Sequence, residues 1–541
     1  MLTKKMVRAA SLLLLALLIT IAAGCQSYGG VDFNQTLKNG LTVTSVESKG
    51  VYELELHMDE AMLDSHAEYY GEEEAALLRL FSNIQLELHQ SKLQDETRMS
   101  MDGVLKLGSQ ESLSIGFQTR MDGETLAIEL EGAKAPLTLD LTGEELLQLN
   151  GLEAAAMESP LEPAMDEETM TQIGFELMDI IGDYSIGNLP NPSNLKVAPV
   201  SLPIGGKDTA LLRASFTMSG DELWTWIQTY VEALIADRNG LDAMVERILD
   251  VVDSNPELWA LIGGMNPMQT GFLDAPTERE MIEEASEAIL DSLVTLQEEL
   301  EAIHEEEQAM LESTLFGDAL QLKHEMYVDH KMDIRKQTFE LTYSQEEPAE
   351  EELSMGLPIS GFTIRGDIEN WNVNGPVVAD QPDNARETIA LEQVQQGFQL
   401  MKHVEKGSDL YTLLTEGFHL NRQTYNAYTY SYRNPPIIMP GFTSMVAVRD
   451  VADALGAEVE YNGSTRRVAV KDPYTNTTIE FTPGDDQVLV NGELEEWPIP
   501  PFVINWTTYV HARKLAEALG ADIEWTGYPG GGGYVTIQRE I

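Results

Sequence analysis

Apolar and polar residues alternate through much of residues 41–141, which predicts a β-rich region. The clearest alternating positions are Leu113, Ile115 and Phe117, followed by Leu126, Ile128 and Leu130. Asp122-Gly123 lies between these two runs and Asp102-Gly103 lies upstream, and an aspartate-glycine pair flanked by such runs is a hairpin signal. An amphipathic stretch at 75–81 predicts a helix packed on the strands. The pattern therefore predicts an antiparallel sheet with one buried face.

A second region of the same kind follows a proline- and asparagine-rich loop at 188–193, which marks a seam between two halves. Alternation at 212–218 predicts a strand, and Ser219 with Glu222 forms a capping box at the start of a helix. The apolar face of that helix consists of Leu223, Ile227, Val231 and Leu234, and Asn239-Gly240 ends it. Further alternating runs at 339–343 and 362–364 predict more strands of the same sheet.

A longer helix is predicted to begin at another capping box, Thr277 to Glu280. Its apolar positions recur every seven residues: Ile282, Ile289, Leu296, Ile303 and Met310, with Leu293 and Leu300 at the other seam position. Glutamates occupy the remaining faces. Two interpretations fit this pattern: a coiled-coil surface for a partner, or an amphipathic helix packed on the protein's own sheet. The second arrangement is the commoner one.

The fold class predicted from these patterns is α+β, with an antiparallel sheet and packed amphipathic helices in the body and a small C-terminal module. The expected divisions are a signal segment 1–24, a tether 25–39, a body 40–375 with possible halves 40–150 and 197–375, a helical connector 376–434, and a module 435–541. The helical pattern within the connector runs from about 388 to 418.

The C-terminal module contains an internal repeat. TSMVAVR (443–449) precedes ADALGAEVEY (452–461), and TTYVHAR (507–513) precedes AEALGADIEW (516–525), so the two copies are offset by 64 residues. Each copy predicts a strand, a short helix and a strand. Gly456 and Gly520 end the two helices, where the chain reversal needs a positive φ. Arg449 and Arg513 occupy matching positions, which favours a shared packing or salt-bridge role.

This repeat block resembles the copper amine oxidase N-terminal-like domain, also called a stalk domain. The family pattern around the arginine is valine-proline-leucine-arginine, and Ala447 and His511 replace the proline in this sequence. The resemblance covers about one fifth of the chain and implies a presentation or binding module on a bacterial surface, with neither copper nor quinone. The Asn-Tyr-Asp/Glu tripeptide that a catalytic amine oxidase domain needs does not occur in the sequence, nor does a His-x-His pair.

The body resembles the LolA-like lipoprotein-carrier folds in two stretches, 120–128 and 327–335. Those folds are curved antiparallel sheets closed by helices around an apolar cavity. The resemblance therefore implies an alternative function, in which the body carries or binds an apolar ligand.

The first 25 residues have the order of a secretion signal: Lys4, Lys5 and Arg8, then an apolar run from 12 to 23, then Gly24-Cys25. The ending resembles the lipobox of bacterial lipoproteins, after which the thiol of Cys25 is diacylated. A membrane-spanning helix would need about 20 apolar residues, and an ordinary cleaved signal gives no reason for a cysteine at the cut. We therefore expect a lipoprotein on the extracytoplasmic face of the cell membrane, of a Gram-positive bacterium.

Composition supports a soluble body outside the cytoplasm. Cys25 is the sole cysteine, so disulfides contribute nothing, but 43% hydrophobic residues suffice for ordinary cores. The net charge of −56 repels nucleic acid and anionic lipid, which excludes nucleic acid as a partner. Solvation of an envelope protein explains this charge better than specific cation binding does. Cell-wall polymer, a surface protein or divalent cations remain possible partners.

No catalytic, cofactor or metal site is predicted. His324-Glu325 begins a zincin-like string, but the next histidine, His330, is six positions on, whereas a helical zinc pair needs four. A strand-and-turn surface feature is the expected alternative, and His511 is expected to be structural or exposed. The predicted function is a non-enzymatic structural, adhesive or binding role at the cell surface. A hydrolase with a site assembled from distant residues is the least favoured alternative.

Overall fold

The computed structural model divides into two compact units, 1–130 with 137–387 (the body) and 131–136 with 388–541 (the C-terminal unit). It describes residues 28–58, 63–64, 67, 71–108, 112–123, 125–141, 167–255, 258, 278–312, 317, 319–344, 359–383, 386–391, 397–440, 443–528 and 532–541. The predicted signal segment and Cys25 lie outside these residues.

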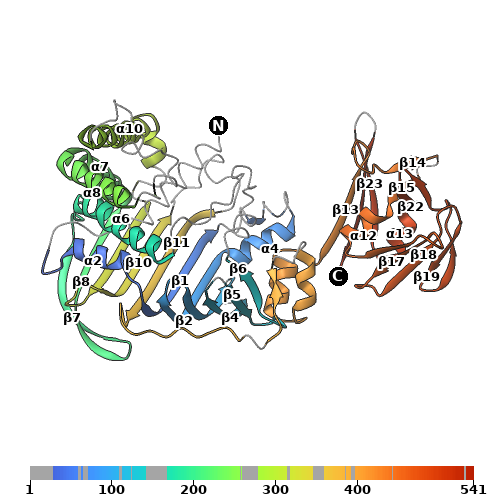
Figure 1. Ribbon diagram of the computed structural model, residues 1–541, viewed down its shortest axis with the longest axis horizontal. Coiled ribbons are helices and arrows are strands. Elements are labelled where there is room, and N and C mark those ends of the chain that lie inside the picture. The colour runs from blue at the N-terminus through green and yellow to red at the C-terminus, as the bar shows by residue number, and fades with distance from the viewer. Residues whose placement is uncertain are drawn as a thin grey trace. The chain divides into compact units, whose positions relative to one another are not determined.

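The body is built on one antiparallel sheet (Figure 1). Its strands are β1 (Val46–Met58), β2 (Asn83–Asp95), β3 (Arg98–Leu107), β4 (Leu113–Asp122), β5 (Thr125–Leu130), β6 (Leu137–Asp140), β7 (Lys196–Ile204), β8 (Lys207–Ser219), β9 (Leu320–Val328), β10 (Ile334–Ser344) and β11 (Ile359–Trp371). Their order is β6-β5-β4-β3-β2-β1-β11-β10-β9-β8-β7. The two expected halves therefore form one sheet, because β1 pairs with β11 from Glu47 to Met58. The α+β class is confirmed.

Side chains alternate between the two faces of this sheet. Leu54 lies opposite Ile364 and Ile84 on one face, and Glu53 lies opposite Arg365 on the other. The second face is polar, with ion pairs between neighbouring strands such as Lys106–Glu87 at 2.9 Å and Lys323–Glu340 at 2.7 Å. One apolar and one polar face is the usual pattern of an antiparallel sheet with one solvated side.

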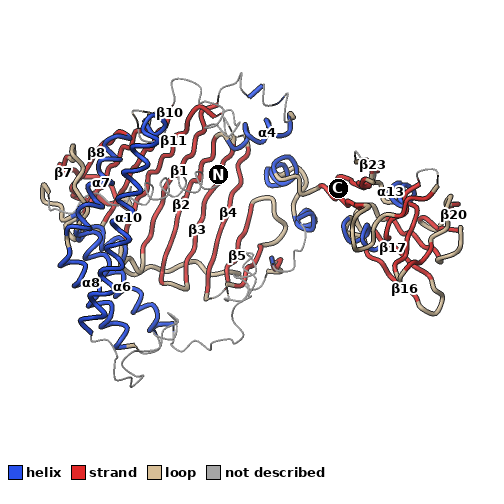
Figure 2. Tube along the Cα trace, turned by 90° about the horizontal axis from the view of Figure 1, so that it is seen from above, coloured by secondary structure: helices blue, strands red, loops and turns tan. Residues whose placement is uncertain are grey.

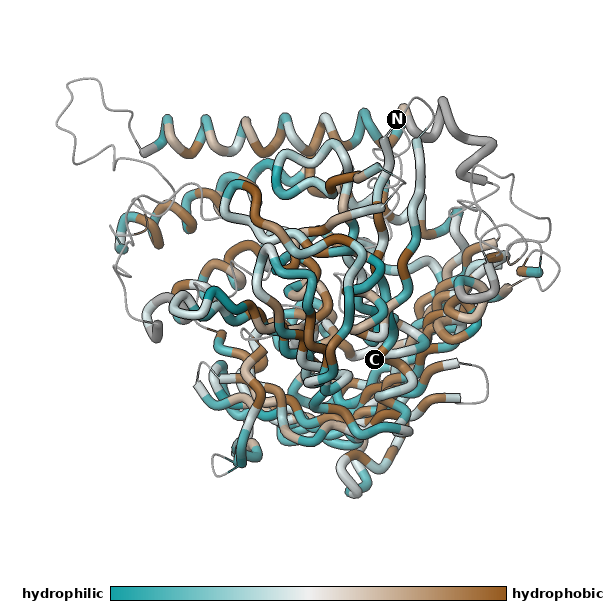
Figure 3. The backbone as a smooth tube through the Cα atoms, turned by 90° about the vertical axis from the view of Figure 1, so that its right-hand side faces the viewer, coloured by the Kyte–Doolittle hydropathy of each residue, from teal (hydrophilic) through white to brown (hydrophobic). Residues whose placement is uncertain are grey.

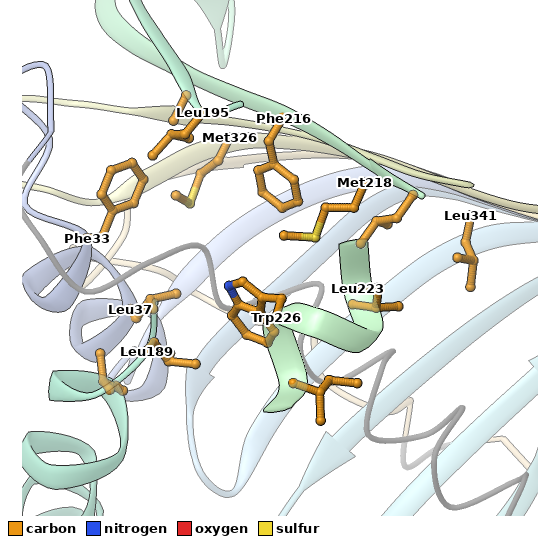
Figure 4. Close-up of a cluster of buried hydrophobic side chains, with 14 of the residues drawn as sticks. Phe33, Leu37, Leu189, Leu195, Phe216, Met218, Leu223, Trp226, Met326 and Leu341 are labelled. Carbon is orange, nitrogen blue, oxygen red and sulfur yellow. The ribbon is translucent and has the colours of Figure 1, made fainter. Parts of the chain in front are cut away.

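Helices cover the apolar face over β8–β10, which we call the covered half (Figure 2). The body helices are α2 (Phe33–Leu41), α4 (Glu72–Phe81), α6 (Glu167–Gly187), α7 (Gly220–Ala236), α8 (Arg238–Ser254) and α10 (Glu278–Glu312). The predicted capping box starts α7: Ser219 Oγ accepts from the Glu222 amide at 3.3 Å, and Glu222 Oε2 accepts from the Ser219 amide at 3.0 Å. Figure 4 shows the core beneath α7, where Leu223 and Trp226 meet Phe216, Met218 and Met326.

The long helix α10 packs on helices of its own chain. Ile282, Ile289 and Leu293 join a cluster formed by α6 and α8, and Leu300 is buried in the core above the sheet. Hydrophilic and hydrophobic positions alternate along the helix (Figure 3). The intramolecular interpretation of the heptad pattern is therefore the better one, although the contacts are mainly with α7 and α8. The predicted cap Thr277 lies outside the described residues.

One of the two predicted hairpins is wrong. Asp122 ends β4 and Gly123, with a φ of 63°, follows it before β5, as expected. Asp102-Gly103 instead lies inside β3, where Gly103 pairs with Leu88 and Phe117. A Cβ atom at Gly103 would lie 2.8 Å from Cζ of Phe117. This glycine therefore permits a close approach of an aromatic ring, which the sequence pattern does not distinguish from a turn.

The segment expected to begin the connector is packed onto the body. Val377 and Ala379 are buried, and Asp380 accepts from Lys92 Nζ at 3.0 Å while its amide donates to Ser100 Oγ at 3.1 Å. The expected helix at 388–418 is broken into short pieces: β12 (Ile389–Ala390), the 3₁₀ helix η2 (Gly397–His403), α11 (Asp409–Thr412) and the π-helical turn η3 (Leu413–Gly417). These belong to the C-terminal unit.

The C-terminal unit contains both predicted strand-helix-strand copies. Copy one comprises β15 (Thr443–Ala447), α12 (Val448–Ala454) and β16 (Glu458–Asn462), and copy two comprises β22 (Thr507–His511), α13 (Ala512–Ala518) and β23 (Asp522–Gly527). The other strands are β13 (Arg422–Tyr428), β14 (Ile437–Met439), β17 (Arg467–Asp472), β18 (Thr477–Phe481), β19 (Gln487–Val490), β20 (Glu493–Glu496), β21 (Phe502–Ile504) and β24 (Gly533–Glu540). The sheets have the orders β14-β15-β22-β21, β16-β17-β18-β19-β20 and β13-β24-β23. The copies meet where β15 pairs with β22, Val446 opposite Val510.

A buried ion pair connects the two copies. Arg539 pairs with Asp472, and both are almost inaccessible to solvent. Arg539 also donates to the carbonyl oxygens of Leu455 and Leu519, at 2.8 and 2.5 Å, which are the corresponding residues at the ends of α12 and α13. Burial acts to raise the pKa of Asp472, but hydrogen bonds from Arg539, Thr475 and a backbone amide lower it overall. Arg539 thus donates hydrogen bonds to carbonyl groups at the C-terminal ends of both helices, where such groups lack intrahelical partners.

Candidate functional site

The apolar face of the sheet continues beyond the helices onto β1–β5, which we call the open half. The side chains that form this open apolar face are Tyr52, Leu54, Leu56, Ile84, Leu86, Leu88, Met101, Leu105, Phe117, Met121, Leu126, Ile128 and Leu130. All are partly exposed, Tyr52 the most at 37%, whereas Leu107, Leu113 and Ile115 on the same face are buried. Strands are about 4.8 Å apart, so the face is about 20 Å wide. Most of these residues lie opposite another apolar residue or a glycine on the next strand, and Ser91 and Thr119 interrupt the face beside Met101.

The two halves differ in how far their apolar side chains are covered. In the covered half, Leu322, Met326 and Leu341 are at most 2% exposed. In the open half, Leu54 and Leu86 are partly exposed and Tyr52 is 37% exposed. The described helix packed against the open half is α4, which contacts β2. Large contiguous apolar surfaces of this kind mark ligand or partner sites.

Glycines bring aromatic rings close to the sheet on this face. Phe117 lies over Gly103, and Phe339 on β10 lies over Gly366 on β11. A side chain at either glycine would collide with the ring. Gly50 is a third small residue, opposite Leu88. At Gly103 and Gly366 the ring from the neighbouring strand therefore fills the space that a side chain would take.

The open apolar face carries no side-chain charge at the positions that define it. Burial raises the pKa of Tyr52, so its hydroxyl stays protonated at neutral pH. The charged groups of the same strands point to the opposite face, where Arg365 bonds Glu53 at 3.2 Å and Glu55 at 3.1 Å. The face can therefore hold an apolar molecule by burial of surface area, at about 25 cal/mol per Å².

The two histidines of the zincin-like string, His324 and His330, lie apart, on β9 and in the turn after it. His324 lies on β9 beneath the helices, 1% exposed, with Phe216 at 5.2 Å and Gln337 as its Nε2 partner at 3.0 Å. Burial lowers its pKa to about 4. His330 is exposed in the following turn. The strand-and-turn expectation holds, but His324 is a core residue instead of a surface one. No group of three metal-ligating side chains occurs in the part of the chain that the structure describes.

The repeat-matched residues lie at the ends of the two short helices. Gly456 and Gly520 have φ values of 70° and 66° after α12 and α13. Arg449 and Arg513 are exposed in the first turn of these helices, and within the described ranges neither has an ion-pair partner. The salt bridge between the copies is made by Asp472 and Arg539 instead. His511 has a structural position: its Nδ1 accepts from the Lys514 amide at 3.2 Å and caps α13.

Sequence reasoning predicted a β-rich region at 41–141 and located β4 and β5 in it, but it missed two features. The exposed half became visible only once β1 was seen to pair with β11, a contact between distant parts of the chain. Arg539 was missed because a longer loop in copy two shifts β24 out of the 64-residue offset.

Among the described residues, no helix is both long and apolar enough to cross a bilayer.

Comparison with known proteins gives one match. The family described as the copper amine oxidase N-terminal domain matches residues 424–529, which confirms the resemblance found in the repeat. That domain is a non-catalytic part of those enzymes. The match also includes part of β13, upstream of the predicted module start at 435. No curated protein and no solved structure matches this chain.

Proposed function

We propose that this protein is a lipid-anchored, extracytoplasmic binding protein without catalytic activity, and that its body holds an apolar ligand on the open apolar face. The observation that carries the ligand class is the contrast within one sheet: helices bury the alternating apolar side chains over β8–β10, whereas most of those over β1–β5 are partly exposed, apart from the buried Leu107, Leu113 and Ile115. Leaving so many leucines in water costs stability. A ligand that covers them offsets this cost.

The location rests on the sequence. The charged, apolar and small-residue order that ends in Cys25 supports export and diacylation. Two acyl chains give a stable attachment, whereas one is marginal. Metabolic labelling with a palmitate analogue should mark the protein, and Cys25→Ser should abolish the label and release the protein from membranes. An unlabelled wild-type protein would contradict the anchor and leave the ligand proposal standing.

The ligand proposal is tested with two neighbouring residues of β1. Tyr52 and Val51 are both 37% exposed, but Tyr52 points to the open apolar face and Val51 to the polar face. The full-length protein should bind the neutral dye Nile red, and its organic extract should contain an apolar species in stoichiometric amount by mass spectrometry. Tyr52→Gln should weaken dye binding severalfold, and Val51→Gln should leave it unchanged.

Two results would contradict the ligand proposal. One is a purified protein that neither releases an apolar species nor binds the dye. The other is equal binding by Tyr52→Gln and Val51→Gln, which would place the dye elsewhere. A non-enzymatic structural or adhesive role of the anchored protein would then be the better description of the body.

A further inference from the structure

The outer face of the sheet β13-β24-β23 in the C-terminal unit carries an exposed cluster of tyrosines. Tyr428, Tyr430, Tyr528 and Tyr534 form a closed set of ring contacts, with centroid distances of 5.4, 5.2, 6.1 and 5.9 Å. Tyr428 lies directly opposite Tyr534 across β13 and β24. Tyr430 is 66% exposed and Tyr528 is 38% exposed. Four rings in contact, two of them exposed and two partly exposed, are more than scattered surface aromatics.

The backbone beneath the rings is held rigidly. The Thr429 amide donates to the Gly533 carbonyl, and the Gly533 amide donates to Thr429 Oγ1, both at 3.0 Å. The Tyr528 amide donates to the Gly532 carbonyl at 3.1 Å. A Cβ atom at Gly533 would approach the Trp525 ring at 2.7 Å, so only glycine fits there. Rings on a fixed backbone lose little conformational entropy on binding.

The rest of this face combines neutral hydrogen-bonding groups on β13 and β24 with two acids on β23. Moving along the strands from the tyrosines, the next rows contain Thr526, Asn426, Thr536, Thr424 and Gln538. Acidic residues occur on the edge strand as Asp522 and Glu524, and Arg422 is paired with Glu540 at 3.3 Å at the far end. The face thus has aromatic rings at one end and, beyond them, amides and hydroxyls bordered by the acids of β23.

The first copy of the repeat provides an internal comparison. Val470 lies opposite Val459 in copy one, and Ile537 lies opposite Ile523 in copy two, so β24 is shifted by three further residues relative to β17. By this correspondence Arg467 and Lys471 occupy the places of Tyr534 and Gln538. Both form surface ion pairs, Arg467–Glu480 at 3.5 Å and Lys471–Glu460 at 2.6 Å. The tyrosine cluster, including Tyr528 in the longer loop, is therefore specific to copy two and is not required by the repeat fold.

We propose that this tyrosine face binds a neutral polysaccharide chain. The apolar faces of pyranose rings stack on aromatic side chains, and the hydroxyls of the chain match the Thr, Asn and Gln groups in the following rows. Tyrosine suits such a surface because it joins an apolar ring to a hydroxyl. The net charge of −56 and the acids of β23 disfavour nucleic acid and other polyanions, which would also stack on or bind near such rings. A neutral polymer of sugar rings is therefore compatible with both the tyrosine face and the negative charge of the protein.

The test uses the full-length protein and immobilised neutral polysaccharides: a β-1,4-glucan, a β-1,3-glucan, an α-glucan and a β-1,4-mannan. We expect binding to at least one of them, unchanged in 0.5 M NaCl because charge takes no part. The double variant Tyr430→Ala with Tyr528→Ala should weaken it roughly tenfold or more. Tyr430→Phe with Tyr528→Phe should retain most of the affinity, since the rings remain. Both positions are exposed, so an unchanged melting temperature should show that the variants fold.

Tyr461→Ala is the matched control, because Tyr461 is an exposed tyrosine, 59% accessible, on β16 of copy one. It should leave polysaccharide binding unchanged. Binding to none of the four polymers would overturn the proposal. So would binding that is lost at high salt, or binding that persists in the double alanine variant. Binding to neutral lipid vesicles in place of the polysaccharides would show that the face is a membrane contact. The apolar-ligand proposal for the body is unaffected by any of these outcomes.

Discussion

The covered and open halves of the body sheet have the same sequence pattern and different surroundings. Leu322 on β9 and Leu54 on β1 both alternate with polar residues, and both point to the apolar face. Helices α7 and α10 leave Leu322 only 2% exposed, whereas Leu54 remains partly exposed. Alternation therefore specifies which face is apolar, and the packing of helices decides whether that face is a core or a binding surface.

The largest expected effect separates the two halves by stability. Leu322→Ala should lower the free energy of unfolding of the body by about 2–5 kcal/mol, because it leaves a cavity in a filled core. Leu54→Ala should cost about 1 kcal/mol or less, since less buried surface is lost. Urea denaturation of the full-length variants, followed by circular dichroism, measures both. Equal losses would mean that the open half is a second core.

The covered half should also be the pH-sensitive one. Burial lowers the pKa of His324 to about 4, so the unfolded chain takes up a proton below about 6.5 while the folded chain does not. The body should therefore lose roughly 3 kcal/mol of stability as the pH falls from about 6.5 to about 4. His324→Gln should flatten this part of the stability profile. His330→Gln, at an exposed position, should keep the wild-type slope, and a slope unchanged by His324→Gln would contradict the assignment.

The sequence predicted those features of the two halves that depend on local patterns. It did not predict those that depend on contacts between residues far apart in the chain. Alternation located β4 and β8, and Ser219 with Glu222 fixed the start of α7, because these signals are local. The pairing of β1 with β11 joins residues about 300 positions apart, and no local pattern encodes it. The open face follows from that pairing, so it was not predicted residue by residue.

The same limit explains the errors in smaller features. Asp102-Gly103 has the composition of a turn, but Gly103 lies within β3. The Phe117 ring of the neighbouring strand β4 leaves no room for a side chain there. The link between Asp472 and Arg539 needs the strand register of both copies, which the 64-residue offset does not give. The tyrosine face could have been suspected from the closely spaced tyrosines of 425–432 and the glycine-rich segment after Tyr528, yet its assembly also depends on β13 pairing with β24.

The glycines of the open half give a smaller and more specific test. Gly103→Ala should cost about 1–3 kcal/mol, because the added methyl group would collide with the Glu87 carbonyl oxygen and displace the Phe117 ring. The double variant Gly103→Ala with Phe117→Ala should lose less than the sum of the two single losses, as expected for residues in contact. Gly174→Ala is the control: it lies in α6 with no atom near its Cβ position, so it should be neutral or slightly stabilising. Additive losses would mean that the Glu87 carbonyl oxygen, and not the Phe117 ring, sets the cost of a side chain at Gly103.

The smallest expected effect concerns the polar face where the two halves join. Arg365 on β11 bonds Glu53 and Glu55 on β1 and Glu340 on β10, so it links both halves through charge. The side chain is 41% exposed, and solvent screens such pairs, so Arg365→Met should cost no more than about 1 kcal/mol and less in high salt. Urea denaturation at low and high salt measures the difference. A loss above about 2 kcal/mol would show that this polar network, instead of the backbone pairing of β1 with β11, holds the covered and open halves together.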